Sequence, residues 1–204
     1  ELGLSGYYYE YTATSPERKN LASVRSGEYE GLPEKLKDPE WKPDFGPAKF
    51  NAKYGCTAIS ARDFLVAYNI NLNTTSTRRA NSVAFDVREQ GRIVKEGDKT
   101  VRVPGSLKSV KAIGWYIKEY GIAQISMNLT NINTTPVHIA FDEVCKKTEA
   151  RGLRVTGSEL VGLIPLKSML EAGKYFLKKQ KRSAGVSQQE LIQIAVKSMG
   201  LDEL

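Results

Sequence analysis

Residues 110–129 read Val-Lys-Ala-Ile-Gly-Trp-Tyr-Ile-Lys-Glu-Tyr-Gly-Ile-Ala-Gln-Ile-Ser-Met-Asn-Leu, and they contain two strand patterns with only a short break between them. The first runs from Val110 to Lys118, Gly121 interrupts it, and the second runs from Ile122 to Leu129. Alternation along the second pattern places four apolar residues on one face: Ala123, Ile125, Met127 and Leu129. Two strands separated by so short a break are typical of an antiparallel hairpin.

A strand and a helix are expected before this hairpin, and a helix and a strand after it. Residues from Phe64 to Asn71 alternate at strand spacing, and apolar residues from Ala80 to Val87 recur at helical spacing. Further on, Thr135 is a favourable N-cap and Pro136 a favourable first helical residue. Residues from Leu153 to Leu163 give the last strand.

The order strand, helix, strand, strand, helix, strand is that of a ferredoxin-like β-α-β-β-α-β sandwich. We therefore predict an α+β fold, with an antiparallel sheet and helices on one of its faces. The polar residues 91–106 are expected to form a loop. Two more helices are expected after Pro165, the last of them with Ser187 and Glu190 as a capping box.

The first part of the chain has a different character, which predicts two domains, 1–57 and 58–204. A strand pattern from Tyr7 to Tyr11 is followed by a long segment rich in Pro and Gly. Such a segment is usually functional or disordered, and aromatic residues such as Trp41 and Phe45 favour an ordered one. The opening residues are interpreted as the end of a helix that leads into the strand, so the chain is expected to begin within a domain.

Composition limits the class of protein. The chain has 204 residues, 41% of them hydrophobic, as in an ordinary soluble globular protein, and no apolar run approaches the ~20 residues of a membrane-spanning helix. A cytoplasmic protein without a membrane partner is expected. Cys56, Cys145 and the single histidine have no metal-ligand spacing, so no metal site is expected. The net charge of +7 favours an anionic partner, with a solvated basic surface as the open alternative.

The segment richest in candidate binding residues lies between two glycines: Gly46, Pro47, Ala48, Lys49, Phe50, Asn51, Ala52, Lys53, Tyr54 and Gly55. Glycine permits a positive φ or a close approach of the backbone to a ligand. The two aromatic rings could stack on a flat heterocycle, and the two lysines could meet carboxylates. A ligand that is flat at one end and anionic at the other would suit this segment. The alternative is a linker that its aromatic residues hold in place.

A second candidate group is rich in amides and lies on or beside the expected sheet: Asn69, Asn71, Gln124, Ser126, Asn128, Asn131 and Asn133. These side chains could line a cleft or form the solvated face of an antiparallel sheet. The only histidine, His138, falls in the first turn of a helix, where a neutral imidazole is favoured. A structural role for His138 is the alternative, and no Ser/His/Asp set forms around it.

Four stretches, taken together and in order, resemble glutamate formiminotransferase, the folate enzyme that is also the N-terminal part of formiminotransferase-cyclodeaminase. They cover nearly the whole chain, and only their combination is specific. They are Arg25-Ser-Gly-Glu-Tyr-Glu-Gly-Leu-Pro-Glu-Lys-Leu36; Pro43-Asp-Phe-Gly-Pro47; Asn69-Ile-Asn-Leu72 with Val87-Arg-Glu-Gln-Gly-Arg92; and Ile113-Gly-Trp-Tyr116 with Gly157-Ser-Glu-Leu-Val-Gly-Leu-Ile-Pro165.

This resemblance implies transfer of a formimino group from N-formimino-L-glutamate to N5 of tetrahydrofolate in histidine breakdown, without a metal. It implies two ferredoxin-like halves with folate between them, the folate-binding loop being Gly46–Gly55. Residues 1–57 would be the tail of the first half and 58–204 the second. The expected partners are tetrahydrofolate, including its polyglutamylated form, the formimino donor, the rest of the first half, and a second copy in a homodimer. The candidate cleft-lining residues are Asn69, Asn71, Asn128, His138 and Glu159.

Two departures from the family pattern stand out. The family's catalytic histidine lies in a His-Lys-Gly-Glu-His-Pro-type segment, and these 204 residues contain none. His138 matches a different histidine of the family, so no catalytic residue is expected in this chain. At Glu159 some members carry glutamine. A carboxylate there could bind the N–H edge of the pterin or face the cationic formimino group.

Three alternatives remain open at this stage. One is a relative on the same scaffold that transfers a formyl group, and another is a non-catalytic fragment. The third is a basic RNA-binding ferredoxin-like module, which predicts aromatic residues on its third strand. Ile122–Leu129 contains none, which argues against a nucleic-acid partner.

Overall fold

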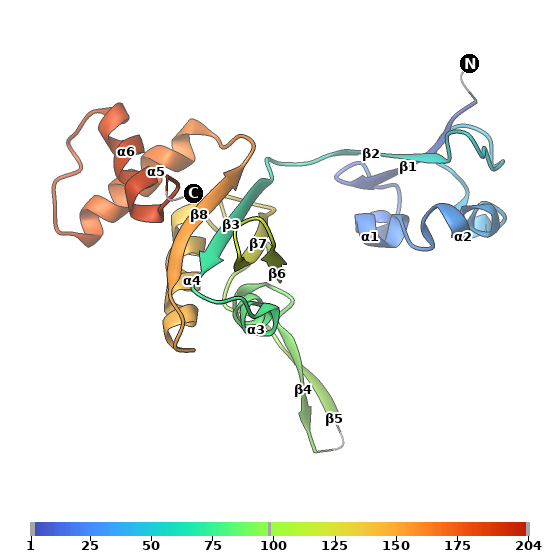
Figure 1. Cartoon of the computed structure of the whole chain (residues 1–204). Helices are drawn as coiled ribbons and strands as arrows, with labels where there is room; N and C mark the ends of the chain where they lie inside the picture. Colours follow the sequence, from blue (N-terminus) through green and yellow to red (C-terminus); the bar gives the residue numbers. More distant parts are fainter. Residues whose placement is uncertain (1–2, 98, 203–204) are drawn as a thin grey trace. The chain divides into compact units, whose positions relative to one another are not determined.

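The computed structural model describes residues 3–97 and 99–202. The chain divides into two compact units, Glu1–Asp63 and Phe64–Leu204 (Figure 1). Each unit encloses a hydrophobic core of its own. None of the helices within the described ranges has the length and apolar character that crossing a membrane would require.

The second unit is built on a four-stranded antiparallel sheet with strand order β6-β7-β3-β8. The strands are β3 Val66–Leu72, β6 Val110–Ile117, β7 Ile122–Leu129 and β8 Val155–Val161. Helix α3 (Thr77–Val87) lies between β3 and β6 in the chain, and α4 (Val137–Glu149) lies between β7 and β8. The predicted β-α-β-β-α-β order and the α+β class are confirmed.

The two faces of this sheet differ in chemistry because side chains alternate along each strand. On one face the apolar residues of β3 pair in register with those of β7, from Val66 opposite Leu129 to Leu72 opposite Ala123. Helices α3 and α4 pack their apolar residues against this face: Ala80, Val83, Ala84, Val87, Val137, Ala140, Phe141 and Val144. Each large aliphatic side chain fully buried here contributes about 1.5–3 kcal/mol. The polar residues of the strands are left on the opposite face.

A β-hairpin occupies the region expected to be a loop, so that expectation was wrong. Strand β4 (Arg92–Glu96) pairs antiparallel with β5 (Lys99–Val103). The hairpin extends beyond the sheet and helices of the second unit (Figure 1). Every residue of β5 is exposed, so no buried face imposes the alternation that reveals a strand. The base of the hairpin is fixed by the Asp86 carboxylate, which accepts hydrogen bonds from Arg92 and from Arg151 Nε (2.7 Å).

Two further helices complete the second unit, α5 (Leu166–Lys179) and α6 (Gln188–Met199). The cap predicted for the last helix is present, because Ser187 Oγ accepts a hydrogen bond from the backbone N–H of Glu190 at 3.2 Å. The cap expected at Thr135 was wrong, since the helix has Pro136 as its N-cap residue. The Thr135 hydroxyl instead donates to the carbonyl of Lys108 at 2.6 Å.

The first unit combines a two-stranded parallel sheet with short helices. The sheet pairs β1 (Ser5–Glu10) with β2 (Cys56–Ala61), and the helices are α1 (Leu21–Val24) and α2 (Glu28–Lys35), with single 3₁₀ turns at Pro16–Arg18 and Pro39–Trp41. A boundary between residues 57 and 58 would cut through β2. The structure divides after Asp63 instead, because β2 is hydrogen-bonded to β1 and belongs with it.

The irregular segment between α2 and β2 is held by a buried ion pair to the 3₁₀ turn Pro16–Arg18 and by a hydrogen bond to β1. Arg18 Nη1 donates to Asp44 Oδ1 at 2.6 Å, and the two side chains are only 9% and 6% exposed. Arg18 Nη2 donates to the carbonyls of Glu40 (3.0 Å) and Lys42 (2.8 Å). Asp44 Oδ2 accepts from the backbone N–H of Tyr8 at 2.8 Å. These bonds order the approach to the Gly46–Gly55 loop.

Candidate functional site

The Gly46–Gly55 loop has a glycine with positive φ at each of its ends. Gly46 has φ +76°, and a Cβ placed on it would lie 2.0 Å from the carbonyl oxygen of Leu4. Gly55 has φ +61°, although a Cβ there would only reach ordinary contact distance of Tyr29. At Gly46 both the conformation and the close approach exclude a side chain, whereas at Gly55 the conformation alone disfavours one.

Hydrogen bonds fix the shape of the loop between these glycines. Asn51 Oδ1 accepts from the backbone N–H groups of Lys53 (3.0 Å) and Tyr54 (3.2 Å), and the Asn51 carbonyl accepts from Gly55 N–H (2.8 Å). An Asn side chain that closes a turn in this way is a standard local motif. The Tyr29 hydroxyl of α2 donates to the carbonyl of Ala52 at 2.7 Å. The loop is therefore a preformed surface.

The two aromatic rings of the loop have different surroundings. Phe50 packs against the core of the first unit, with its ring 5.5 Å from that of Tyr29. Phe50 is partly buried by these contacts, and it anchors the loop to the core of the first unit. Tyr54 is 58% exposed, and Lys53 Nζ lies 5.1 Å from the centre of its ring. Tyr54 and Lys53 are therefore the aromatic and cationic groups of the loop that remain available together.

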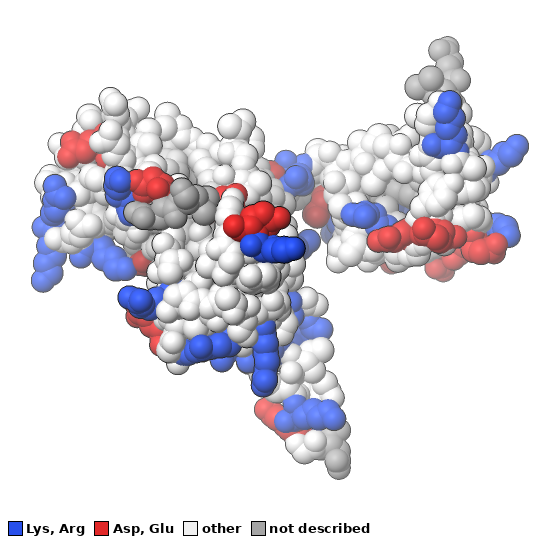
Figure 2. Space-filling model, in the orientation of Figure 1, with Lys and Arg blue, Asp and Glu red and all other residues white. Residues whose placement is uncertain are grey.

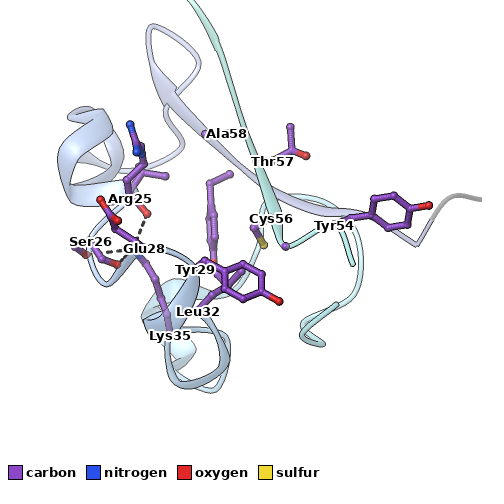
Figure 3. Close-up of a pocket in the computed structure, with 13 residues that line it drawn as sticks. Arg25, Ser26, Glu28, Tyr29, Leu32, Lys35, Tyr54, Cys56, Thr57 and Ala58 are labelled. Atoms are coloured by element: carbon purple, nitrogen blue, oxygen red, sulfur yellow. Dashed lines mark hydrogen bonds between the residues drawn. The ribbon is translucent and has the colours of Figure 1, made fainter. Parts of the chain in front are cut away.

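A pocket of about 350 Å³ adjoins the C-terminal end of this loop (Figure 3). Arg25 and Ser26 line it from the turn before α2. Glu28, Tyr29, Leu32 and Lys35 line it from α2 itself, and Cys56, Thr57 and Ala58 line it from β2. Tyr54 and Gly55 of the loop also line it. In Figure 3 the Tyr29 ring lies between α2 and β2, and Tyr54 points away from Lys35. The pocket and the loop belong to the same unit.

The titratable groups of this pocket are shifted by burial. Burial lowers the pKa of Lys35, and the nearby Arg18 adds to the effect. The Lys35 ammonium donates to the carbonyl of Val24 at 2.6 Å and lies 3.9 Å from the centre of the Trp41 ring. Burial raises the pKa of Tyr7 to about 12, and it also raises the pKa of the Cys56 thiol. A neutral phenol and a neutral thiol therefore line the pocket at neutral pH.

The second candidate group lies on the polar face of the second unit's sheet. Strand register aligns Asn69 of β3 with Ser126 of β7 and Glu159 of β8, and it aligns Asn71 with Gln124 in the next row. Asn128 lies on the same face, opposite Ala67. The structure thus brings together four of the five residues expected to line a cleft: Asn69, Asn71, Asn128 and Glu159.

A hydrogen-bond network fixes the centre of this face. Trp115 Nε1 donates to Gln124 Oε1 at 3.1 Å, which leaves the Gln124 amide nitrogen as a donor. That nitrogen donates to Asn71 Oδ1 at 2.7 Å and to Glu159 Oε2 at 3.2 Å. Asn69 Nδ2 donates to the same Glu159 oxygen at 3.3 Å. Two amide donors therefore orient one carboxylate.

His138, the fifth expected cleft residue, is not part of this face. It lies on α4, which covers the opposite, apolar face, and its ring stacks at 4.6 Å on that of Tyr175 in α5. Its Nδ1 atom is buried without a hydrogen-bond partner. Burial lowers the pKa of His138, while Glu171 and Asp142 act in the opposite direction. His138 is a buried packing residue because α4 turns it toward α5.

We expect the second unit to lose stability as the pH falls below about 6.5, the usual pKa of histidine in an unfolded chain. The folded-state pKa of His138 is lower than that value, so the unfolded state binds more protons in this range. This contribution amounts to at most about 1.4 kcal/mol per pH unit and ends below the folded-state pKa. Urea unfolding of the wild type and of His138→Phe between pH 5 and 8 measures it. A variant with the same pH dependence as the wild type would contradict this assignment.

Some residues of both sites are not apparent from sequence spacing alone. Trp115 joins the polar face through Gln124, and the alternation of Lys111, Ile113 and Trp115 on one side of β6 is the signal that could have identified it. Arg25 lines the pocket from a turn, and Lys35 lines it from the short helix α2. No sequence pattern reveals that these segments lie beside β2. Within the described ranges, no group of three or more His, Cys, Asp or Glu residues gathers to hold a metal ion.

Charge is distributed widely over both units. On the face that Figure 2 shows, Lys and Arg side chains lie in several separate groups, including one on the β4–β5 hairpin. The positive charge is thus not concentrated in one surface on this side of the molecule. A local ligand site has to be argued from individual side chains.

Two protein families that describe parts of the same domain match nearly the whole chain. The family described as "Formiminotransferase domain, N-terminal subdomain" matches residues 1–62, and the family described as "Formiminotransferase domain" matches residues 67–204. The interval between the two matches contains the division between the two units.

The curated relatives carry related names. Formimidoyltransferase-cyclodeaminase of Gallus gallus is 46% identical over 100% of this chain and 36% of its own length, and its Dictyostelium discoideum counterpart is 44% identical over 98% and 36%. Glutamate formimidoyltransferase of Streptococcus pyogenes serotype M1 is 38% identical over 87% of this chain and 55% of its own length. The chain therefore spans between about a third and just over half of the length of these relatives.

Proposed function

This chain belongs to the formiminotransferase family, and from that premise we propose that the protein containing it is a glutamate formiminotransferase. The proposed reaction moves the formimino group of N-formimino-L-glutamate to N5 of tetrahydrofolate and releases L-glutamate. It belongs to histidine degradation and takes place in the cytoplasm. The names of the relatives, which describe formimidoyl transfer, support this reaction class.

The observation that carries the proposal is the preformed loop beside the pocket of the first unit. Residues Gly46 to Gly55 form the folate-binding loop, including Pro47, Ala48, Lys49 and Asn51. Tyr54 offers an exposed ring to a flat pterin or benzoyl group, and Lys53 lies beside it. Aromatic contacts of this kind contribute about 0.5–1.5 kcal/mol beyond the area they bury.

The first unit carries cationic side chains that could bind the carboxylates of both substrates. Folate ends in a glutamate, or in several when polyglutamylated, and the donor is a dicarboxylate. Arg25 is exposed at the rim of the pocket, and Lys53 lies on the loop. Each charge-assisted hydrogen bond to a carboxylate adds about 1.5–3 kcal/mol when water is excluded.

The transfer itself requires a nitrogen nucleophile, an amidine carbon and protons that move through a tetrahedral intermediate. Holding the two substrates together supplies much of the rate. His138, the only histidine of the chain, is buried in helix packing. We therefore assign the acid-base group to a histidine outside Glu1–Leu204, in the rest of the first half of the enzyme. A second copy in a homodimer completes the proposed assembly.

The test of the reaction class is an assay of the longer protein with tetrahydrofolate and each of two donors, N-formimino-L-glutamate and N-formyl-L-glutamate. The proposal predicts 5-formiminotetrahydrofolate as the product and preference for the first donor. Preference for the formyl donor would assign the protein to the formyl-transferring alternative. No transfer from either donor would leave the chain as a non-catalytic member of the family.

A further inference from the structure

The β4–β5 hairpin is a separate two-stranded sheet that extends beyond the main sheet and helices of the second unit (Figure 1). An isolated pair of strands is at best marginally stable in water, and a third strand or a packed face is normally required. Three apolar side chains of the hairpin are nevertheless exposed: Ile93 at 62%, Val101 at 38% and Val103 at 42%. The hairpin therefore has the character of an element that a partner completes.

The main sheet of the second unit offers little room for an added strand, because contacts cover both of its edges. Its edge strands are β6 and β8. On β6, the Asn81 side chain of α3 accepts from the N–H of Gly114 at 3.0 Å and donates to the Gly114 carbonyl at 2.9 Å. On β8, the N–H of Ser158 donates to the carbonyl of Gly200, at the end of α6, at 2.8 Å. An added strand would have to displace these bonds.

The outer edge of β5 is accessible by comparison. Within residues 3–97 and 99–202, no backbone group of Lys99–Val103 bonds to a backbone group outside the hairpin. All of β5 is exposed, whereas β4 is partly buried at Arg92 and Val94. A row of unpaired N–H and C=O groups on an exposed strand is a template for pairing with another strand. The edge of β5 is therefore the better candidate for strand addition.

The sequence of β5 is compatible with pairing to itself about a two-fold axis. In an antiparallel pair centred on Val101, this residue lies opposite its own copy. Thr100 then lies opposite Arg102, and the next pair joins Lys99 to Val103. No like charges are directly opposed in this register, whereas a pair centred on Arg102 would oppose two guanidinium groups, which is destabilising. The charge pattern thus favours the register centred on Val101.

The same register continues an apolar row across both hairpins. Val94 lies opposite Val101 within one hairpin, and directly opposed side chains share a face of the sheet. The two-fold axis therefore gives a row of valines, with two from each copy. β-Branched side chains pack well against one another on a pleated surface. Because the paired strands run antiparallel, the main sheets of the two copies lie toward opposite ends of the ribbon.

We propose that the edge of β5 is the surface through which two copies of this chain associate, in an antiparallel pairing centred on Val101. The partner is a second copy because the edge is complementary to itself in charge and in apolar pattern. An isologous contact of this kind closes on itself and stops at a dimer. The inference goes beyond the proposed reaction, since it concerns a surface outside the Gly46–Gly55 loop and its pocket. Association and transfer are measured separately, so either proposal can fail alone.

The first test is analytical ultracentrifugation of the 204-residue chain from about 1 μM to about 1 mM, because contacts of this small size are usually weak. We expect a dimer that forms as the concentration rises. Val101→Lys places two introduced lysines opposite each other and should weaken dimerisation at least about tenfold. Leu163→Lys makes the same kind of change at a side chain 94% exposed before α5 and should leave dimerisation unchanged. A monomeric parent chain, or a Val101→Lys chain that dimerises like the parent, would overturn the proposal.

A pair of opposite charges tests the register. Val101→Glu alone should dimerise as poorly as Val101→Lys, because it also opposes two like charges. An equimolar mixture of the two variants should recover association, since the introduced lysine and the introduced glutamate then face each other. Native mass spectrometry with one variant labelled with ¹⁵N identifies the mixed dimer. A mixture that associates no better than either variant alone would overturn pairing about Val101.

A measurement on the parent chain makes the test independent of how well the variants fold. Amide hydrogen exchange is compared at a low and a high protein concentration. We expect the amides of Lys99–Val103 to become more protected at the high concentration, because pairing removes the β5 edge from water. The amides of β6, whose edge Asn81 already covers, should not change. Added protection confined to other segments would show that the copies associate elsewhere and would overturn the proposal.

Discussion

Replacing Arg18 with alanine is expected to unfold the first unit in water while the second unit stays folded. The substitution leaves Asp44, whose side chain is 6% exposed, without its counter-charge. Removing one partner of a buried ion pair costs about 3–5 kcal/mol. A core of this size rarely supplies more than about 3–5 kcal/mol of net stability. The guanidinium also lies 5.3 Å from the centre of the Tyr7 ring, so a packing contact is lost as well.

The measurement is urea unfolding followed by tryptophan fluorescence. Trp41 lies in the first unit and Trp115 in the second, so Trp115→Phe leaves one reporter for the first unit. Arg62→Ala, at an exposed arginine of the same unit, is the matched control and should unfold like the parent protein. A first unit that retains its unfolding midpoint after loss of Arg18 would show that the ion pair does not hold the loop segment in place.

The second large effect concerns catalysis. Turnover of N-formimino-L-glutamate by the 204-residue chain should be about 10²–10⁴ lower than turnover by the longer protein that contains the histidine segment. This factor is the usual contribution of one general acid or base. Replacing that histidine by asparagine in the longer protein should lower its rate by the same factor. His138→Phe should leave the rate unchanged, because His138 is packed against Tyr175.

The assay is initial-rate formation of 5-formiminotetrahydrofolate at saturating substrates. Equal turnover by the chain and by the longer protein would mean that the acid-base group lies within Glu1–Leu204. A loss of rate in His138→Phe would identify His138 as that group, and the assignment of a histidine outside the chain would then be wrong.

The sheet of the second unit was predictable because one of its faces is buried. Burial forces apolar residues to alternate in β3 and β7, and the 3.6-residue period of α3 and α4 matches that face. The β4–β5 hairpin has no buried face, and its alternation therefore carries no signal. The parallel pairing of β1 with β2 joins residues far apart in sequence, which local patterns do not encode.

The candidate sites were predictable in part for the same reasons. Asn69, Asn71 and Glu159 fall on one face because strand alternation and register place them there. His138 was grouped with them because it lies near the start of a helix, but the direction of its side chain depends on how α4 packs against α5. The sequence pattern also does not distinguish the roles of the two rings of the loop. Phe50 anchors the loop to the core, whereas Tyr54 stays exposed.

The most direct test of the central claim is the affinity of the 204-residue chain for tetrahydrofolate, measured by titration calorimetry under anaerobic conditions. Tyr54→Ala removes an exposed ring of the loop that has no core contact, and Tyr120→Ala removes a ring of similar exposure in the second unit. We predict saturable binding by the parent chain, about tenfold weaker binding by Tyr54→Ala, and unchanged binding by Tyr120→Ala. No binding by the parent chain, or equal affinity in all three proteins, would contradict the assignment of Gly46–Gly55 as the folate-binding loop.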